Sequence, residues 1–503
     1  MDLVNNIAHG FEVAFTLQNL GYAFIGCFLG TMIGVLPGIA PITTIAILLP
    51  FTFTLEPASS LIMLAGIFYG AQYGGSTTAI LVNLPGESTA VVTCLDGHQM
   101  ARQGRAGAAL AVAALGSFFA GTVGTLIIAG LAMPLADFAL KFSSPEYFSL
   151  MVLGLIASVV LASGSVVKAM AMVVIGLLLG IVGTDVNSGT PRFTFGFNEL
   201  SDGIIFVAIS MGIFGFAEII SNLQHTMNRD IVTRKITGLW PTREDAKAAA
   251  PAVLRGTAIG SVLGFVPGGG ILLATFASYL VEKKLAKDPS RFGKGAIEGV
   301  AGPESANNAA SQTSFIPMLT LGLPSTASMA LMIWAMTVHN VQPGPMVLTR
   351  NPDLFWGLIA SMWIGNAMLV ILNLPLIGLW VKLLRVPYSF LFPAILLFCC
   401  IGVYSINYST FEVLLTVVFG FIGYLFVKLE CEPAPLLLGF VIGPMMEENL
   451  RRAMLLSRGD PKVFIDRPIS FGMLIVAALL LVVLAVPFVK KKRKEAFTEG
   501  DVK

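Results

Sequence analysis

Two apolar stretches carry the same interrupted motif, and this repetition limits the possible folds more than any other feature. Residues 30–38 read GTMIGVLPG and residues 260–268 read GSVLGFVPG. The first stretch lies in a run, residues 13–55, that has no Asp, Glu, Lys or Arg and exceeds the roughly 20 residues of one membrane-spanning helix. A Pro–Gly pair breaks a helix, and matched breaks in two halves of a chain are typical of a transporter binding site.

The composition places the chain in a membrane. Of its 503 residues, 55% are hydrophobic and 12% are charged, whereas soluble domains average about 25% charged residues. We therefore predict an all-α polytopic membrane protein of about 12 transmembrane or re-entrant elements. These form two homologous, inverted repeats, with a re-entrant hairpin in each.

Charged segments mark the boundaries between the repeats. We assign residues 1–223 to the first membrane repeat, 224–255 to a cytoplasmic linker loop, 256–468 to the second repeat, and 469–503 to a last transmembrane helix with a basic tail. The tail and the linker are both rich in Lys and Arg, which favours the cytoplasmic side. Inverted repeats satisfy both signals and place the C-terminus in the cytoplasm.

A polar segment follows each break and supplies candidate substrate ligands. Hydroxyls, amides and helix N-termini can bind a carboxylate without a permanent positive charge in the membrane. Each hydroxyl taken alone could instead bond its own backbone or a neighbouring helix. The candidates are Gly74, Gly75, Ser76, Thr77, Thr78, Asn83, Pro85 and Gly86 in the first half, and Asn307, Asn308, Ser311, Gln312, Thr313, Ser325 and Thr326 in the second.

The breaks themselves are candidate cation ligands, because unwound carbonyls at Pro37, Gly38, Pro267 and Gly268, together with Asn307, could coordinate a cation. Either break alone could also be a simple kink. Acidic residues near the predicted span ends are either functional or solvated. These are Glu87, Glu218, Glu304, Glu447 and Glu448.

Catalytic patterns are missing from the sequence. It contains no HExxH pair, no GxSxG elbow and no GxxxxGK[ST] phosphate loop. We expect no enzymatic activity, no metal site and no cofactor. Uphill transport would then depend on an ion gradient, with Na⁺ or H⁺ as the co-transported ion.

The motifs together resemble a known family. Residues 34–39 (GVLPGI), 69–80 (YGAQYGGSTTAI), 84–86 (LPG) and 302–308 (GPESANN) look like the large membrane subunit, TctA-like, of the bacterial tripartite tricarboxylate transporters. The resemblance covers residues from about 15 to about 490. It implies a multi-pass protein of the inner membrane that works with a small four-span membrane subunit and a periplasmic solute-binding protein.

The resemblance also implies a function. Such a subunit receives a di- or tricarboxylate such as citrate from the binding protein and moves it inward, coupled to a cation gradient that is often sodium, by an elevator-like alternating-access motion. Two alternatives stay open at this stage. One is a channel-like pore, and the other is an ion-coupled carrier of another small organic anion that works without a binding protein.

Overall fold

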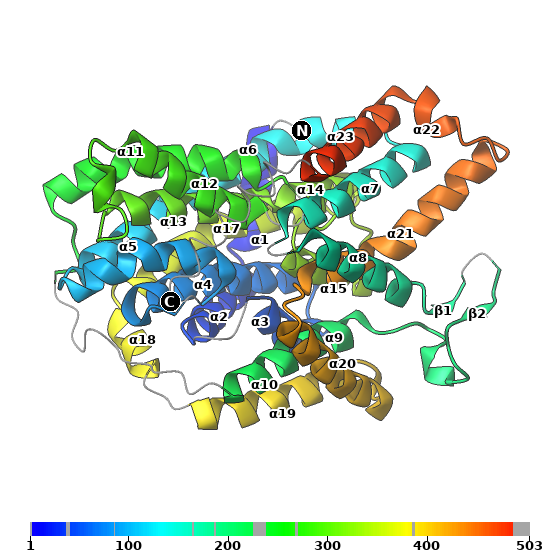
Figure 1. The fold of residues 1–503 in the computed structure, drawn as a ribbon, viewed down its shortest axis with the longest axis horizontal. Coiled ribbons are helices and arrows are strands. Elements are labelled where there is room, and N and C mark those ends of the chain that lie inside the picture. The colour runs from blue at the N-terminus through cyan, green and yellow to red at the C-terminus, as the bar shows by residue number, and fades with distance from the viewer. Residues whose placement is uncertain are drawn as a thin grey trace.

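The described part of the molecule is almost entirely helical. The computed structural model describes residues 3–36, 41–84, 86–162, 165–185, 188–224, 238–266, 270–384 and 388–485. In these residues the one sheet is a short antiparallel pair, β1 (Gly183–Thr184) and β2 (Pro191–Arg192), which projects from the helices (Figure 1). This agrees with the predicted all-α class.

Residues that favour helix ends lie at the ends of helices in the first half. Pro57 starts the longest buried helix of this half, where its missing N–H costs nothing, and Asn83 ends that helix in a left-handed conformation with φ 60°. The elements are α1 (Leu3–Ala14), α2 (Leu17–Gly34), α3 (Pro41–Leu48), η1 (Leu49–Thr52), α4 (Pro57–Val82), η2 (Ser88–Ala90), α5 (Val91–Arg102), α6 (Ala106–Ala139), α7 (Ser144–Leu161), α8 (Val166–Gly180), η3 (Asn198–Leu200), α9 (Phe206–Ser210), the π-helical turn η4 (Met211–Phe216) and α10 (Ala217–Gln224).

A helix begins inside the segment predicted to be a linker, residues 224–255. Thr242 caps a helix that starts at Arg243, so residues 243–255 are helical. The elements are α11 (Arg243–Leu263), α12 (Gly270–Leu285), η5 (Pro289–Arg291), α13 (Glu298–Thr313), α14 (Phe315–Leu321), α15 (Ala327–Val338), α16 (Val347–Arg350), α17 (Pro352–Asn373), α18 (Ile377–Leu383), α19 (Tyr388–Asn407), α20 (Thr410–Lys428), α21 (Ala434–Leu456), α22 (Val463–Asp466) and α23 (Pro468–Ala485).

Glycines bring α2 and α4 into backbone contact. A Cβ atom added to Gly30 would lie 2.3 Å from the carbonyl oxygen of Ile67, and one added to Gly34 would lie 2.5 Å from that of Ala71. Small residues allow this close approach of membrane helices. The pair therefore packs through its backbones and not through long side chains.

Helices α11 and α13 repeat this packing. A Cβ on Gly260 would lie 2.2 Å from the carbonyl oxygen of Ala306, and one on Gly264 would lie 2.5 Å from that of Ala310. The glycines are displaced by 230 positions from their counterparts in α2, and the carbonyls by 239 positions from theirs in α4. The same register in both pairs supports the predicted repeat.

In each of two outer groups, a helix of the first half packs on a helix of the second half (Figure 1). Helix α8 packs on α21, where a Cβ on Gly176 would lie 2.1 Å from the carbonyl oxygen of Leu436. Helix α20 packs on η4, where a Cβ on Gly212 would lie 2.6 Å from the carbonyl oxygen of Thr416. Each outer group thus joins elements from both halves.

Several helices suit a bilayer. Within the described residues, four helices are long and apolar enough to cross a membrane: Leu17–Gly34, Ala106–Ala139, Pro352–Asn373 and Thr410–Lys428. Further apolar helices of 10–17 residues accompany them. The chain is therefore a multi-pass membrane protein.

Candidate functional site

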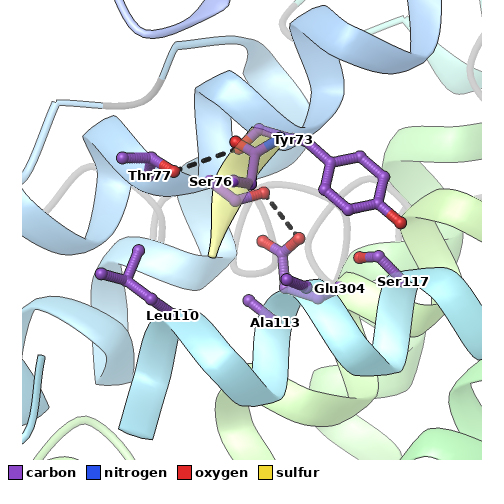
Figure 2. A pocket seen from close by; sticks show the side chains of 9 residues that line it. Tyr73, Ser76, Thr77, Leu110, Ala113, Ser117 and Glu304 are labelled. Atoms are coloured by element: carbon purple, nitrogen blue, oxygen red, sulfur yellow. Dashed lines mark hydrogen bonds between the residues drawn. The ribbon is translucent and has the colours of Figure 1, made fainter. Parts of the chain in front are cut away.

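The polar segments of the two halves meet at the contact between α4 and α13. The carboxylate of Glu304 on α13 accepts a hydrogen bond of 2.6 Å from Ser76 Oγ on α4 and another from Thr93 Oγ1 on α5. Figure 2 shows the Ser76 hydroxyl facing this carboxylate. All three side chains are buried. The structure thus brings together residues more than 200 positions apart in the sequence.

One helical turn away, an amide pair extends the same contact. Asn307 Nδ2 on α13 donates to Gln72 Oε1 at 3.1 Å and to Glu87 Oε1 at 3.2 Å. Thr89 Oγ1 also donates to Glu87. With its amide atoms exchanged, Gln72 donates to Glu87 and accepts from Ser311 Oγ at 3.3 Å. Gln72 therefore joins both polar segments in either orientation.

Asn308 and Gln312 face a different helix. Asn308 Nδ2 donates to Ser117 Oγ on α6 at 2.6 Å and to the Glu304 carbonyl at 3.1 Å. Gln312 packs against α6, because a Cβ on Gly124 would lie 2.8 Å from Gln312 Cβ. These side chains fix α13 on α6.

A cavity of about 230 Å³ lies beside the amide pair. First-turn residues of four helices line it: Pro41 and Ile42 of α3, Ile271 and Leu272 of α12, Thr326, Ala327 and Ser328 of α15, and Pro433 and Ala434 of α21. Its remaining lining residues are Phe68, Gln72, Glu87, Thr89, Phe214, Glu432 and Leu438. Helix N-termini present free N–H groups and a partial positive charge, so this cavity can attract an anion.

Equivalent positions of the two halves line this cavity. Residues 41–42 correspond to 271–272 at the displacement of 230 positions that relates the glycines of α2 and α11. Glu87 and Thr89 correspond to Thr326 and Ser328 at the displacement of 239 positions that relates α4 and α13. Matched positions of the two halves therefore contribute to the same cavity.

Other predicted ligands have packing roles in the structure. Gly74 lies inside the continuous helix α4, and a Cβ there would lie 2.6 Å from the Thr31 carbonyl oxygen of α2. Thr78 Oγ1 donates to the Val35 carbonyl at 2.7 Å. Gly75 and Gly86 approach each other, because a Cβ on Gly86 would lie 2.5 Å from Gly75 Cα.

The last predicted ligands are dispersed. Asn83 is exposed at the end of α4, and Thr77 Oγ1 bonds the Tyr73 carbonyl at 3.4 Å. Thr313 bonds the Ala309 carbonyl of its own helix at 3.1 Å, and Ser325 bonds the Ser314 carbonyl at 2.9 Å. Pro37, Gly38, Pro85, Pro267 and Gly268 lie outside the described residues.

Gln72, Thr89 and Thr93 take part in this contact, although they were not among the predicted ligands. Gln72 precedes Ser76 by four positions, so both lie on one face of α4. That spacing was available in the sequence. The approach of Thr93 to Glu304 depends on how α5 packs on α13, which no local pattern indicates. In the described chain no three His, Cys, Asp or Glu side chains gather as a metal site.

A multi-pass helical chain whose two halves enclose a cavity among helix N-termini has the features of a membrane transport protein. The family model of the "Tripartite tricarboxylate transporter TctA family" matches residues 20–438. The chain therefore belongs to this transporter family, as its motifs predicted.

Two proteins of Agrobacterium vitis are similar to this chain. The first, named "Uncharacterized 52.8 kDa protein in TAR-I ttuC' 3'region", is 58% identical over 501 residues, which cover 100% of both chains. The second, named "Uncharacterized protein in TAR-II ttuC' 3'region", is 58% identical over 242 residues, 48% of this chain and 100% of the relative. No solved structure matches the chain.

Proposed function

We propose that this chain is the membrane-spanning transport subunit of a tripartite carboxylate uptake system driven by a cation gradient, with sodium as the coupling ion. It receives a di- or tricarboxylate such as citrate from a periplasmic binding protein and works with a small four-span subunit in the inner membrane. Its C-terminus faces the cytoplasm. The transporter family supports the tripartite assembly.

The observation that carries the proposal is the cavity of about 230 Å³ at the N-termini of α3, α12, α15 and α21. Each N-terminus contributes roughly half a positive charge, and Thr326 and Ser328 add hydroxyls at the same wall. No Lys or Arg lines the cavity among the described residues. A carboxylate held by dipoles and hydroxyls can leave again, which a carrier requires.

The acidic lining supports cation coupling. Glu87 lines the cavity and accepts hydrogen bonds from the neutral groups of Thr89 and Asn307, so a carboxylate that enters the cavity meets an acidic side chain. The partial charges of the helix ends offset this repulsion only in part, because they fall off within the first turn. A cation that binds with the carboxylate removes the remaining penalty. We therefore propose symport and not exchange of anions.

The arrangement of the helices is compatible with an elevator-like motion. The tightly packed pairs α2–α4 and α11–α13 hold the polar contact, while the outer groups pair α8 with α21 and α20 with η4. We propose that the inner pairs move as one body against the outer groups and carry the cavity across the membrane.

The test is uptake into proteoliposomes that contain this chain, the small subunit and the binding protein. Radiolabelled citrate and a panel of di- and tricarboxylates are offered with and without an inward sodium gradient. We expect saturable, gradient-dependent uptake that requires the binding protein. Gradient-independent flux at channel rates would contradict the carrier proposal, and uptake without the binding protein would contradict the tripartite one.

A matched pair of variants tests the cavity. Ser328→Phe places a ring in the cavity, whereas Ser405→Phe makes the same change on the exposed face of α19. We expect Ser328→Phe to lower uptake by more than about tenfold, because a filled site excludes the solute. Ser405→Phe should transport like the wild type. Equal uptake by both variants at equal membrane abundance would remove this cavity from the transport path.

A further inference from the structure

A second, much smaller cavity lies between α4, α6, α13 and α17. Its volume is about 10 Å³, close to the space that one water molecule needs. The side chains that line it include Tyr73, Ser76, Ser117, Glu304 and Asn373. Figure 2 shows the side chains of Tyr73 and Ser117 next to Glu304.

Two lining side chains present polar atoms that have no hydrogen-bond partner. The Tyr73 hydroxyl and Asn373 Oδ1 both lack one, although each side chain is only 4% exposed. Leaving a buried polar group unsatisfied costs about 1–3 kcal/mol. Both atoms are therefore available to a group that binds in this cavity.

The cavity also contains a buried acidic side chain without a cationic partner in the described part of the chain. Glu304 is 1% exposed, and its two oxygens accept only from the neutral hydroxyls of Ser76 and Thr93. Every ion pair found within the described residues involves other carboxylates. Buried carboxylates are normally paired with a cation. A water molecule would satisfy the free polar atoms, whereas a cation would satisfy them and also stabilise the ionised form of Glu304.

We propose that this cavity binds one monovalent cation, Na⁺, with the Glu304 carboxylate as its charged ligand and the oxygens of Ser76, Ser117, Tyr73 and Asn373 as neutral ligands. Hard cations prefer such all-oxygen surroundings. One carboxylate balances one monovalent charge, whereas a divalent cation would leave a positive charge in an apolar interior.

The position of the site links it to the larger cavity. Ser76 Oγ also bonds the Gln72 carbonyl at 3.1 Å, and the Gln72 side chain lines the cavity of about 230 Å³. On α13, Glu304 precedes Asn307 by three positions, and Asn307 bonds Gln72 and Glu87. A cation at Glu304 therefore fixes the residues that form one wall of the solute site. Its role as the coupling ion rests on the proposed transport function, whereas its binding does not.

Cation binding can be measured on the purified full chain without transport. The thermal unfolding temperature is recorded while NaCl replaces choline chloride at constant ionic strength, with KCl as a second series. A ligand that binds the folded state raises this temperature in a saturable way. We expect NaCl to do so for the wild type. No saturable effect of NaCl, or an equal effect of KCl, would overturn the assignment of a Na⁺ site.

Three variants locate the site. Glu304→Gln removes the charge at constant size, and we expect the apparent Kd for Na⁺ to rise by about 100-fold or more. Tyr73→Phe removes one neutral ligand and should raise it by about tenfold. Glu298→Gln makes the same chemical change near the start of α13, at a residue paired with Arg291, and should leave Na⁺ binding unchanged.

The outcomes separate this proposal from the transport proposal. Wild-type Na⁺ binding by Glu304→Gln would overturn the site even if carboxylate uptake is normal. Should Glu304→Gln fail to fold, wild-type affinity in Tyr73→Phe would overturn it equally. Na⁺ binding that depends on Glu304 and Tyr73, without any carboxylate uptake, would support the site and reject the transport proposal alone.

Discussion

Adding one methyl group to α2 should have opposite effects at two glycines of the same helix. A Cβ on Gly30 would lie 2.3 Å from the Ile67 carbonyl oxygen and 2.8 Å from Ile67 Cα, both backbone atoms of α4. A Cβ on Gly21 would meet no atom within 4 Å. Gly30→Ala and Gly21→Ala therefore differ only in whether the methyl group has space.

The magnitude follows from the geometry. Real Cβ contacts are essentially never shorter than 3.0 Å, so α4 must move away from Gly30 by at least about 0.7 Å. Such overpacking costs about 1–3 kcal/mol, while Ala gains up to about 1 kcal/mol over Gly in a helix. That gain is common to both variants. We expect Gly30→Ala to be less stable than Gly21→Ala by about 1–3 kcal/mol.

The assay is thermal unfolding of the purified variants in one detergent. Gly21→Ala should unfold at or above the wild-type temperature, and Gly30→Ala below it. Gly260→Ala should match Gly30→Ala, because its Cβ would lie 2.2 Å from the Ala306 carbonyl oxygen. Equal stability of Gly30→Ala and Gly21→Ala would show that α2 and α4 are not in backbone contact and would remove the packing argument for the repeat.

Two further predictions concern the buried and the peripheral carboxylates. Asp96→Ala should destabilise the chain by about 3–5 kcal/mol. The reason is that the Asp96 carboxylate is fully buried and accepts two backbone N–H bonds of 2.7 and 2.8 Å next to the start of α13. Thermal unfolding measures this loss when Asp96→Ala is compared with Asp96→Asn, which keeps an acceptor oxygen. Partial burial raises the pKa of Asp245, but hydrogen bonds from Thr242 and from the Arg105 guanidinium more than offset this and hold that pKa below its usual range. A lowered folded-state pKa stabilises the fold above the ordinary Asp pKa and loses that contribution as the pH falls through the lowered value. Wild-type stability should therefore drop below about pH 4, and Asp245→Asn should show a smaller drop over the same range; an identical pH profile of the two proteins would contradict this.

The sequence contained enough information to predict the helical class and the meeting of the two halves. The matched Gly-x-x-x-Gly spacing, read above only as part of a helix break, also permits close helix pairs, which the structure has at Gly30 and Gly260. Polar residues in runs that should face lipid predict an internal polar contact, and Ser76 and Asn307 both take part in one. Both inferences depend on short periodic patterns, which sequence alone displays.

The division of roles within each polar segment could not be predicted in the same way. Residues 74–78 all looked suitable as ligands, but successive residues of a helix point in different directions. Gly74 and Thr78 face α2, and Ser76 faces α13. Which face meets which helix depends on contacts between distant segments. From the sequence, Glu304 could be either a functional residue or a solvated one. In the structure it is buried at that contact.

Equivalent positions of the two halves meet in the contact between α4 and α13. Gln72 and Ser311 occupy equivalent positions at the displacement of 239 residues, and their side chains lie 3.3 Å apart. Contact between equivalent residues is the arrangement expected near a two-fold axis, as at an isologous interface. The cavity beside Gln72 is likewise lined by matched residues of both halves. It also shows where the halves differ, because Glu87 corresponds to Thr326. One wall of the cavity therefore carries an acid and the equivalent position a helix-capping hydroxyl, which would give the proposed carboxylate one preferred orientation.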